Sequence, residues 1–180
     1  MTSGVATYYE RLGRWNRWAR ALGYGGGSSS LTVHRALADP AAQGRATVTR
    51  LHDLVIERVP SAAGQLRVLD AGCGLGGTML ALAKVRGCSC VGVTLSPTQA
   101  ATANAAAARA GVGHLVQANV RSYDDPPAGP FDLVVAIESL AHSPDPARSV
   151  RALALTLAPG GGVLVIDDMP LASALGTTDL

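Results

Sequence analysis

From Gln65 onward, short runs of valine, leucine and isoleucine alternate with longer segments rich in alanine and leucine. The short runs are continuous rather than interleaved with polar residues, which is typical of strands buried on both faces of a parallel sheet. The longer segments have the length and composition of helices. We therefore expect an α/β domain with right-handed crossovers. The expected strands cover residues 66–70, 89–93, 114–118, 131–136 and 162–167, and the expected helices cover 76–86, 97–110 and 146–157.

The first 60 residues differ in pattern and are expected to form a helical cap or lid on a core that covers residues 61–180. Near the N-terminus, apolar side chains recur at helical spacing and arginines crowd the other side. This amphipathic helix could pack on the domain, cover a bound ligand or lie on a membrane surface. After a break rich in glycine and serine, we expect a short helix over 34–38 and a longer one over 41–59.

Composition narrows the class of protein. The 180 residues suffice for one domain with a sizeable core, and the net charge of +2 is too small to imply a nucleic-acid partner. Apolar runs fall short of the roughly 20 residues of a membrane span, and no signal peptide is evident, so we expect a cytoplasmic protein. Cys73, Cys88 and Cys90 lack C-x-x-C spacing and a histidine cluster, so we expect buried free thiols and no metal.

The most informative segment reads V-L-D-A-G-C-G-L-G-G over residues 68–77. A strand, a glycine loop and a helix follow one another here, which is the arrangement of a nucleotide-type site. Three of the glycines fit the dinucleotide fingerprint G-x-G-x-x-G, which also requires an acid about 20 residues further on. The second strand instead ends in T-L-S-P at 94–97, and no Asp or Glu occurs between Asp70 and Asp124. NAD is therefore disfavoured as the ligand.

Asp70 favours a cationic ligand, because a carboxylate at this place would repel a pyrophosphate. S-adenosylmethionine carries a sulfonium and an ammonium and has no phosphate. Here the chain resembles the class I S-adenosylmethionine-dependent methyltransferases, whose first motif has the form D-x-G-C-G-x-G. Four further segments extend the resemblance to the branch with tocopherol and sterol methyltransferases. They are G-V-T-L-S-P-T-Q at 92–99, Q-A-N-V at 117–120, F-D-L-V-V-A-I-E-S-L-A-H-S-P-D at 131–145 and L-A-P-G-G-G-V-L-V-I-D-D at 157–168.

The resemblance implies a Rossmann-like sheet in the strand order 3-2-1-4-5 with flanking helices. Proteins of this class add a sixth strand and an antiparallel seventh. Residues 169–180 are too few to supply them, so we expect strands 6 and 7 to be missing and the chain to be truncated after the fifth strand. The fifth strand would then expose an apolar edge. A partner or a second copy of the chain could cover this edge.

The resemblance also implies a set of cofactor-binding residues. Asp70 would orient the methionine end, Gln99 would replace the usual ribose-binding acid, and Asn119 with Val120 would contact the adenine. As alternatives, Gln99 could face solvent on its helix, and Asn119 could be a plain loop residue. The full expected set is Asp70, Gly72, Cys73, Gly74, Gly76, Thr94, Leu95, Gln99, Asn119, Val120 and Glu138.

Glu138 and His142 follow the fourth strand and are the candidate catalytic residues. His142 could take a proton from the substrate, because an imidazole titrates near neutral pH, or it could only line the pocket. Asp167 and Asp168 end the fifth strand as candidates for the pocket rim or as turn caps. The remaining histidines have no motif context and are expected to be structural or exposed: His34, His52 and His114.

The expected function is methyl transfer from S-adenosylmethionine to a small-molecule acceptor, with S-adenosylhomocysteine as product. The transfer could be to carbon, nitrogen or oxygen, and the acceptor itself is not legible from the sequence. A second hypothesis is a cofactor-binding fragment or partner-dependent subunit without catalysis of its own. An NAD-dependent oxidoreductase is the third.

Overall fold

The computed structural model describes residues 49–59 and 65–167, together with 31–32, 34, 36–38, 40, 43–44 and 46–47. The expected N-terminal amphipathic helix, the glycine–serine break and Asp168 lie outside the described residues. So does most of the expected cap. None of the described helices combines the length and hydrophobicity that a membrane span needs.

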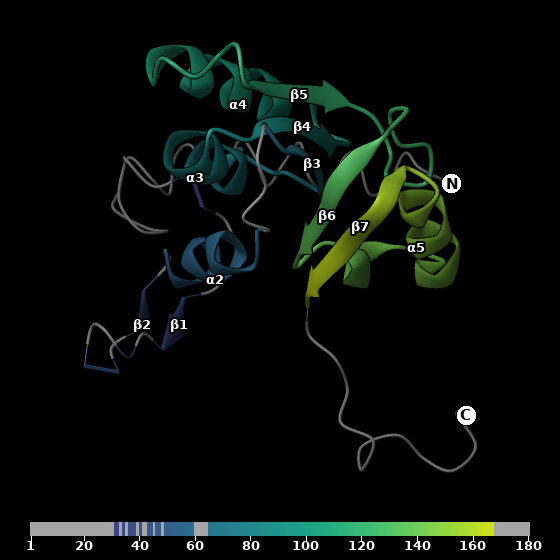
Figure 1. Cartoon of the computed structure of the whole chain (residues 1–180), viewed down its shortest axis with the longest axis horizontal. Coiled ribbons are helices and arrows are strands. Elements are labelled where there is room, and N and C mark those ends of the chain that lie inside the picture. Colours follow the sequence, from purple (N-terminus) through teal and green to yellow (C-terminus); the bar gives the residue numbers. More distant parts are fainter. Residues whose placement is uncertain are drawn as a thin grey trace.

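A five-stranded parallel sheet forms the centre of the described domain, with the strand order β5-β4-β3-β6-β7 (Figure 1). Counted from β3 along the chain, these are the third, second, first, fourth and fifth strands of this sheet. The α/β Rossmann-like class therefore fits the structure. The strands are β3 (Arg67–Ala71), β4 (Ser89–Thr94), β5 (Val116–Val120), β6 (Phe131–Ile137) and β7 (Leu157–Ile166).

The expectation that strands 6 and 7 are missing is wrong. Strands β6 and β7 are both present and pair in parallel, from Phe131 opposite Leu157 to Ile137 opposite Ile166. Two further strands precede the sheet, β1 (Leu37–Ala38) and β2 (Ala46–Thr47), and form a separate antiparallel pair. The sequence did not predict them because two residues are too few for any periodicity to be recognised.

The expected helix over 34–38 is also wrong, and the expected helix over 41–59 is confirmed only in its second half. Gln43 and Gly44 have φ angles of 56° and 77°, so they turn the chain between β1 and β2. Helix α2 then begins only at Arg50 and runs to Arg58. The alanines around this turn suit a helix, but the pairing of the two short strands decides the local structure instead.

Two of the helices that follow begin at polar residues that cap them. In α4 (Pro97–Arg109), the Ser96 side chain accepts a hydrogen bond from the Gln99 N–H. In α5 (Pro146–Ala154), Asp145 does the same for the Arg148 N–H. In both helices proline occupies the first position, where its missing N–H costs nothing. Helix α3 (Gly77–Arg86) and the short 3-10 helix η2 (Leu140–His142) have no such side-chain cap.

The two faces of the sheet are buried in two hydrophobic clusters. Along β3, Val68 belongs to the first cluster and Leu69 to the second, as the alternation of a strand requires. The first cluster includes side chains of α2, α3 and α4, and the second includes Leu153 of α5. Figure 1 shows the same division, with α5 beside β6 and β7 and away from α3 and α4. The three cysteines are buried free thiols, as expected.

Strand β5 lies at one edge of the described sheet, and a side chain pairs with its free backbone. The Asn104 amide nitrogen donates to the Ala118 carbonyl, and the Ala118 N–H donates to the Asn104 carbonyl oxygen, both at 2.8 Å. Helix α4 thereby satisfies an N–H and a carbonyl that no other strand of the described sheet reaches.

Candidate functional site

A cavity of about 700 Å³ lies at the carboxyl ends of the central strands. Loops that follow β3, β4, β5 and β6 line it, together with residues from the segment 31–34 and His52 of α2. This is where open parallel sheets bind their ligands, and the volume suits a small molecule or cofactor.

The glycine loop after β3 forms one wall of the cavity. Gly72 has a φ of 92°, and the N–H groups of Gly72 and Cys73 both donate to the Val93 carbonyl at 3.0 Å. Gly76 faces away from the cavity, because a Cβ there would lie 2.8 Å from the Cβ of Ala103 on α4. The loop therefore needs glycine at 72 and 76 for conformation and close packing.

Asp70 lies at the floor of the cavity, where β3 ends. The residue is only 3% exposed, and burial raises the pKa of its carboxyl to about 7. Within the described residues, the carboxyl forms no hydrogen bond or ion pair. A cationic group bound in the cavity would stabilise the ionised form, whereas a phosphate would oppose it.

Thr94, Leu95 and Gln99 form the wall that follows β4. The Thr94 hydroxyl donates to the Gln99 side-chain oxygen at 2.7 Å, and both residues are buried. Gln99 therefore does not face solvent, contrary to the alternative considered for a residue on the first turn of its helix.

The loop after β5 differs from the sequence-based expectation. Asn119 and Val120 do not line this cavity but a second hollow, together with Val91 and Gln117. Strand β5 ends at Val120, two residues later than expected, so the loop begins at Arg121. This shift of two residues along the chain is why the sequence placed Asn119 and Val120 at the site.

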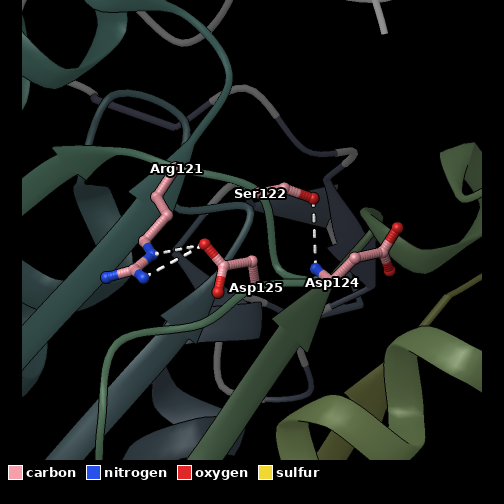
Figure 2. A network of polar contacts seen from close by, with 4 residues as sticks. All are labelled: Arg121, Ser122, Asp124 and Asp125. Atoms are coloured by element: carbon pink, nitrogen blue, oxygen red, sulfur yellow. Dashed lines mark hydrogen bonds and ion pairs between the residues drawn. The ribbon is translucent and has the colours of Figure 1, made fainter. Parts of the chain in front are cut away.

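Residues 121–124 line the cavity instead of Asn119 and Val120. Figure 2 shows how this loop holds itself together. The Arg121 guanidinium pairs with the Asp125 carboxylate at 3.0 Å, and the Asp124 N–H donates to the Ser122 hydroxyl at 3.1 Å. No motif in the sequence identified these residues.

The loop after β6 supplies the wall with the candidate catalytic residues, Glu138 and His142. Glu138 has a φ of 45°, which is unusual for a residue other than glycine, and its N–H donates to the Ile166 carbonyl of β7 at 2.7 Å. A non-glycine residue in the left-handed region costs about 1 kcal/mol or more and is common at functional sites.

Asp167 has a clear structural contact at the same loop. Its carboxylate accepts a hydrogen bond from the Ala141 N–H at 3.0 Å. Asp167 thereby fixes η2, the short helix that carries His142. This contact supports the turn-capping alternative considered for Asp167.

A buried serine joins the two loops on this side of the cavity. The Ser149 hydroxyl donates to the Asp124 carboxylate and lies 2.7 Å from the Ser143 hydroxyl. Asp124 and Ser143 both line the cavity, and Ser149 is fully buried behind them. The walls that follow β5 and β6 are thus held at a fixed separation.

Two histidines from different segments meet at the cavity. The Nε2 atoms of His34 and His52 lie 3.2 Å apart, and the rings pack edge to face at a centroid distance of 5.1 Å. Burial, with a smaller effect of His34, lowers the pKa of His52 to about 4. No pattern in the sequence predicts this pair, because its members come from two segments without a motif. His114 is exposed and lies outside the cavity.

Comparison with known proteins identifies the family. A family model described as "Methyltransferase domain" matches residues 33–176, which is most of the chain. The chain belongs to this methyltransferase family. The residues that the family model matches include the glycine loop, Gln99 and the loop with Glu138 and His142.

Curated methyltransferases are similar to this chain over part of their length. "Tocopherol O-methyltransferase, chloroplastic" from Arabidopsis thaliana is 42% identical over 102 residues, which cover 56% of this chain and 29% of that protein. "Probable tocopherol O-methyltransferase, chloroplastic" from Oryza sativa subsp. japonica is 34% identical over 177 residues, which cover 92% and 46%. The chain therefore spans less than half the length of these two relatives.

Among solved structures, the [4+2]-cyclase SpnF is similar with a TM-score of 0.73 and 28% sequence identity. The similarity covers 89% of this chain and 58% of SpnF. The methyltransferase domain described here thus has the fold of a protein named for a different reaction.

Most residues expected to bind a cofactor in this methyltransferase domain meet at one cavity, and three do not. Gly76, Asn119 and Val120 lie outside its lining. The cavity brings together the other expected residues: Asp70, Gly72, Cys73, Gly74, Thr94, Leu95, Gln99 and Glu138, with His142.

Proposed function

We propose that this chain binds S-adenosylmethionine and transfers its methyl group to a small-molecule acceptor. The observation that carries the proposal is the buried Asp70 carboxyl, without a partner among the described residues, at the floor of a cavity of about 700 Å³. A cationic cofactor without phosphate matches this charge. Membership of the methyltransferase family and the similarity to tocopherol methyltransferases support the same conclusion.

In this proposal the cofactor lies along the carboxyl ends of β3, β4 and β5. Asp70 and the glycine loop would hold the methionine end, with Cys73 and Gly74 as close backbone contacts. Gln99 would bind the ribose, with Leu95 beside it. The adenine role first expected of Asn119 and Val120 passes to residues 121–124, because these residues line the cavity.

Glu138 and His142 would act on the acceptor side of the cavity. When bound, S-adenosylmethionine supplies an electrophilic methyl group on a sulfonium. The backbone of Glu138 would border the methionine moiety, and a His142 ring nitrogen would accept the proton that the acceptor loses. The rest of the rate enhancement would come from holding both reactants in a cavity that excludes most water.

The second candidate is cofactor binding without methyl transfer. Two observations support this second candidate. The chain covers 29% and 46% of the length of the two tocopherol methyltransferases, and the structurally similar SpnF is named a [4+2]-cyclase. In that case a further segment or a partner subunit would complete the acceptor site. We also expect a cytoplasmic location and either a homo-oligomer or a partner that covers the edge of the sheet.

Titration calorimetry with S-adenosylhomocysteine and with NAD tests the cofactor. We expect binding of the sulfur compound and none of NAD. Micromolar binding of NAD alone would overturn the methyltransferase proposal in favour of an oxidoreductase.

Turnover separates methyl transfer from binding alone. We expect transfer of a labelled methyl group from S-adenosylmethionine to tocopherols or other small hydroxylated acceptors. His142→Ala should lower turnover by about 10²- to 10⁴-fold and leave S-adenosylhomocysteine affinity unchanged. Binding without any transfer by the wild-type chain would favour the second candidate.

A further inference from the structure

Three polar side chains of the β4–α4 turn form a directed set of hydrogen bonds. The Ser96 N–H donates to the Thr94 hydroxyl oxygen at 3.2 Å, and the Thr94 hydroxyl donates to the Gln99 side-chain oxygen at 2.7 Å. The Gln99 N–H in turn donates to the Ser96 hydroxyl oxygen at 3.2 Å. Thr94, Ser96 and Gln99 are all buried, with Gln99 only 4% exposed.

The direction of these bonds follows from the hydrogens available. A backbone N–H can only donate, so Ser96 occupies a lone pair of the Thr94 oxygen. The single hydroxyl hydrogen of Thr94 is buried and needs an acceptor, and the Gln99 side-chain oxygen lies within reach. This contact decides which end of the Gln99 amide faces Thr94.

The amide nitrogen of Gln99 therefore faces the other way, toward the cavity. This nitrogen has no hydrogen-bond partner among the described residues. In the same part of the chain, no fully buried side-chain nitrogen or oxygen lacks a partner. The nitrogen is consequently not fully buried, and Gln99 lines the cavity.

We propose that Thr94 is a positioning residue, which holds the Gln99 amide so that its two N–H donors point into the cavity and require a hydrogen-bond acceptor on the ligand. The inference rests on the proposed function, in which this wall binds the ribose of the cofactor. The ribose hydroxyls would then act here as acceptors. A carboxylate at the same place could only accept from them.

Affinity for S-adenosylhomocysteine in matched variants tests the proposal. Thr94→Val keeps the shape and removes the hydroxyl, so the Gln99 amide is free to turn, and we expect affinity to fall about fivefold to tenfold. Thr94→Ser keeps the hydroxyl and should stay within about twofold of the wild type. Thr102→Val is the control, because its hydroxyl bonds the Thr98 carbonyl on the same helix outside the cavity lining.

The outcomes separate this inference from the proposed function. If the wild type fails to bind S-adenosylhomocysteine, both are overturned. If the wild type binds and Thr94→Val binds equally well, only the positioning role is lost.

A spectroscopic measurement on the wild type does not depend on how well Thr94→Val folds. The Gln99 side-chain amide resonances can be assigned by their loss in Gln99→Glu. We expect both amide protons to shift and to exchange more slowly when S-adenosylhomocysteine saturates the protein. Amide resonances that stay unchanged at saturation would overturn the proposal.

Discussion

Gly72 packs against Ser139 in the wall of the cavity, and this packing leaves no room for a side chain at position 72. A Cβ at position 72 would lie 2.5 Å from the Ser139 Cβ. Ser139 cannot easily withdraw, because it is buried and its hydroxyl donates to the Ala71 carbonyl at 2.7 Å. The glycine loop after β3 is thus locked to the loop after β6, which carries the candidate catalytic residues.

Gly72→Ala should therefore destabilise the domain by about 2–4 kcal/mol, since it adds a steric clash to an unfavourable φ of 92°. Gly87→Ala is the matched control: its φ is 65°, but nothing lies within 4 Å of the added Cβ. It should cost only about 1 kcal/mol. Urea unfolding of both variants measures the difference. Equal losses would mean that φ alone requires glycine at position 72.

The pKa of Asp70 predicts that binding of the proposed cofactor depends on pH. The carboxyl has a pKa of about 7, and a bound sulfonium or ammonium would lower it. Binding then releases a proton, so affinity for S-adenosylmethionine should rise by up to about tenfold per pH unit below pH 7 and level off above it. Calorimetry from pH 5.5 to 8 checks the slope. Asp70→Asn should bind weakly with a flat profile, and an unchanged slope in that variant would exclude Asp70 as its origin.

The burial of His52, with a smaller effect of His34 beside it, predicts a specific sensitivity to acid. The pKa of His52 is lowered to about 4 in the folded chain, against about 6.5 when exposed. As the pH falls, His52 therefore takes up a proton in the unfolded chain before it does so in the folded chain. The contribution of neutral His52 to the free energy of unfolding is complete above pH 6.5 and is lost as the pH falls toward 4. The loss should be on the order of 3 kcal/mol. Urea unfolding of His52→Gln at pH 7.5 and pH 4.5 should show a smaller change than the wild type.

His114→Gln serves as the control for that experiment, because His114 is exposed. Its change in stability between the two pH values should match that of the wild type. An equal acid sensitivity in the wild type and in His52→Gln would show that His52 does not couple folding to protons.

The Asn104 side chain should contribute measurably to stability. Asn104→Ala removes two hydrogen bonds and leaves the N–H and carbonyl of Ala118 without that partner. We expect a loss of about 1–3 kcal/mol in urea unfolding. Gln117→Ala, at an exposed position on the same strand, should cost about 0.5 kcal/mol or less. A loss in Asn104→Ala no larger than this would contradict the role of the paired amide.

Local patterns in the sequence were enough to predict the α/β class, and most of the residues expected at the site do line the cavity. The glycine loop and Gln99 lie next to strand ends, so a residue's place along the chain nearly fixes its place at the cavity. Asn119 does not line the cavity, because β5 begins and ends two residues later than its hydrophobic pattern indicates. The His34–His52 contact joins residues 18 apart in the sequence through tertiary packing, which no local pattern encodes.

The pairing of Asn104 with Ala118 also bears on how copies of this chain meet one another in solution. An exposed edge strand is a template onto which another chain can add its own strand, which is how sheets grow into aggregates. In the middle of β5, the backbone N–H and carbonyl of Ala118 are already bonded to the Asn104 side chain of the same molecule. An incoming strand would have to displace both bonds before it could form its own, so we expect this edge to resist addition although β5 itself contains no charged residue or proline.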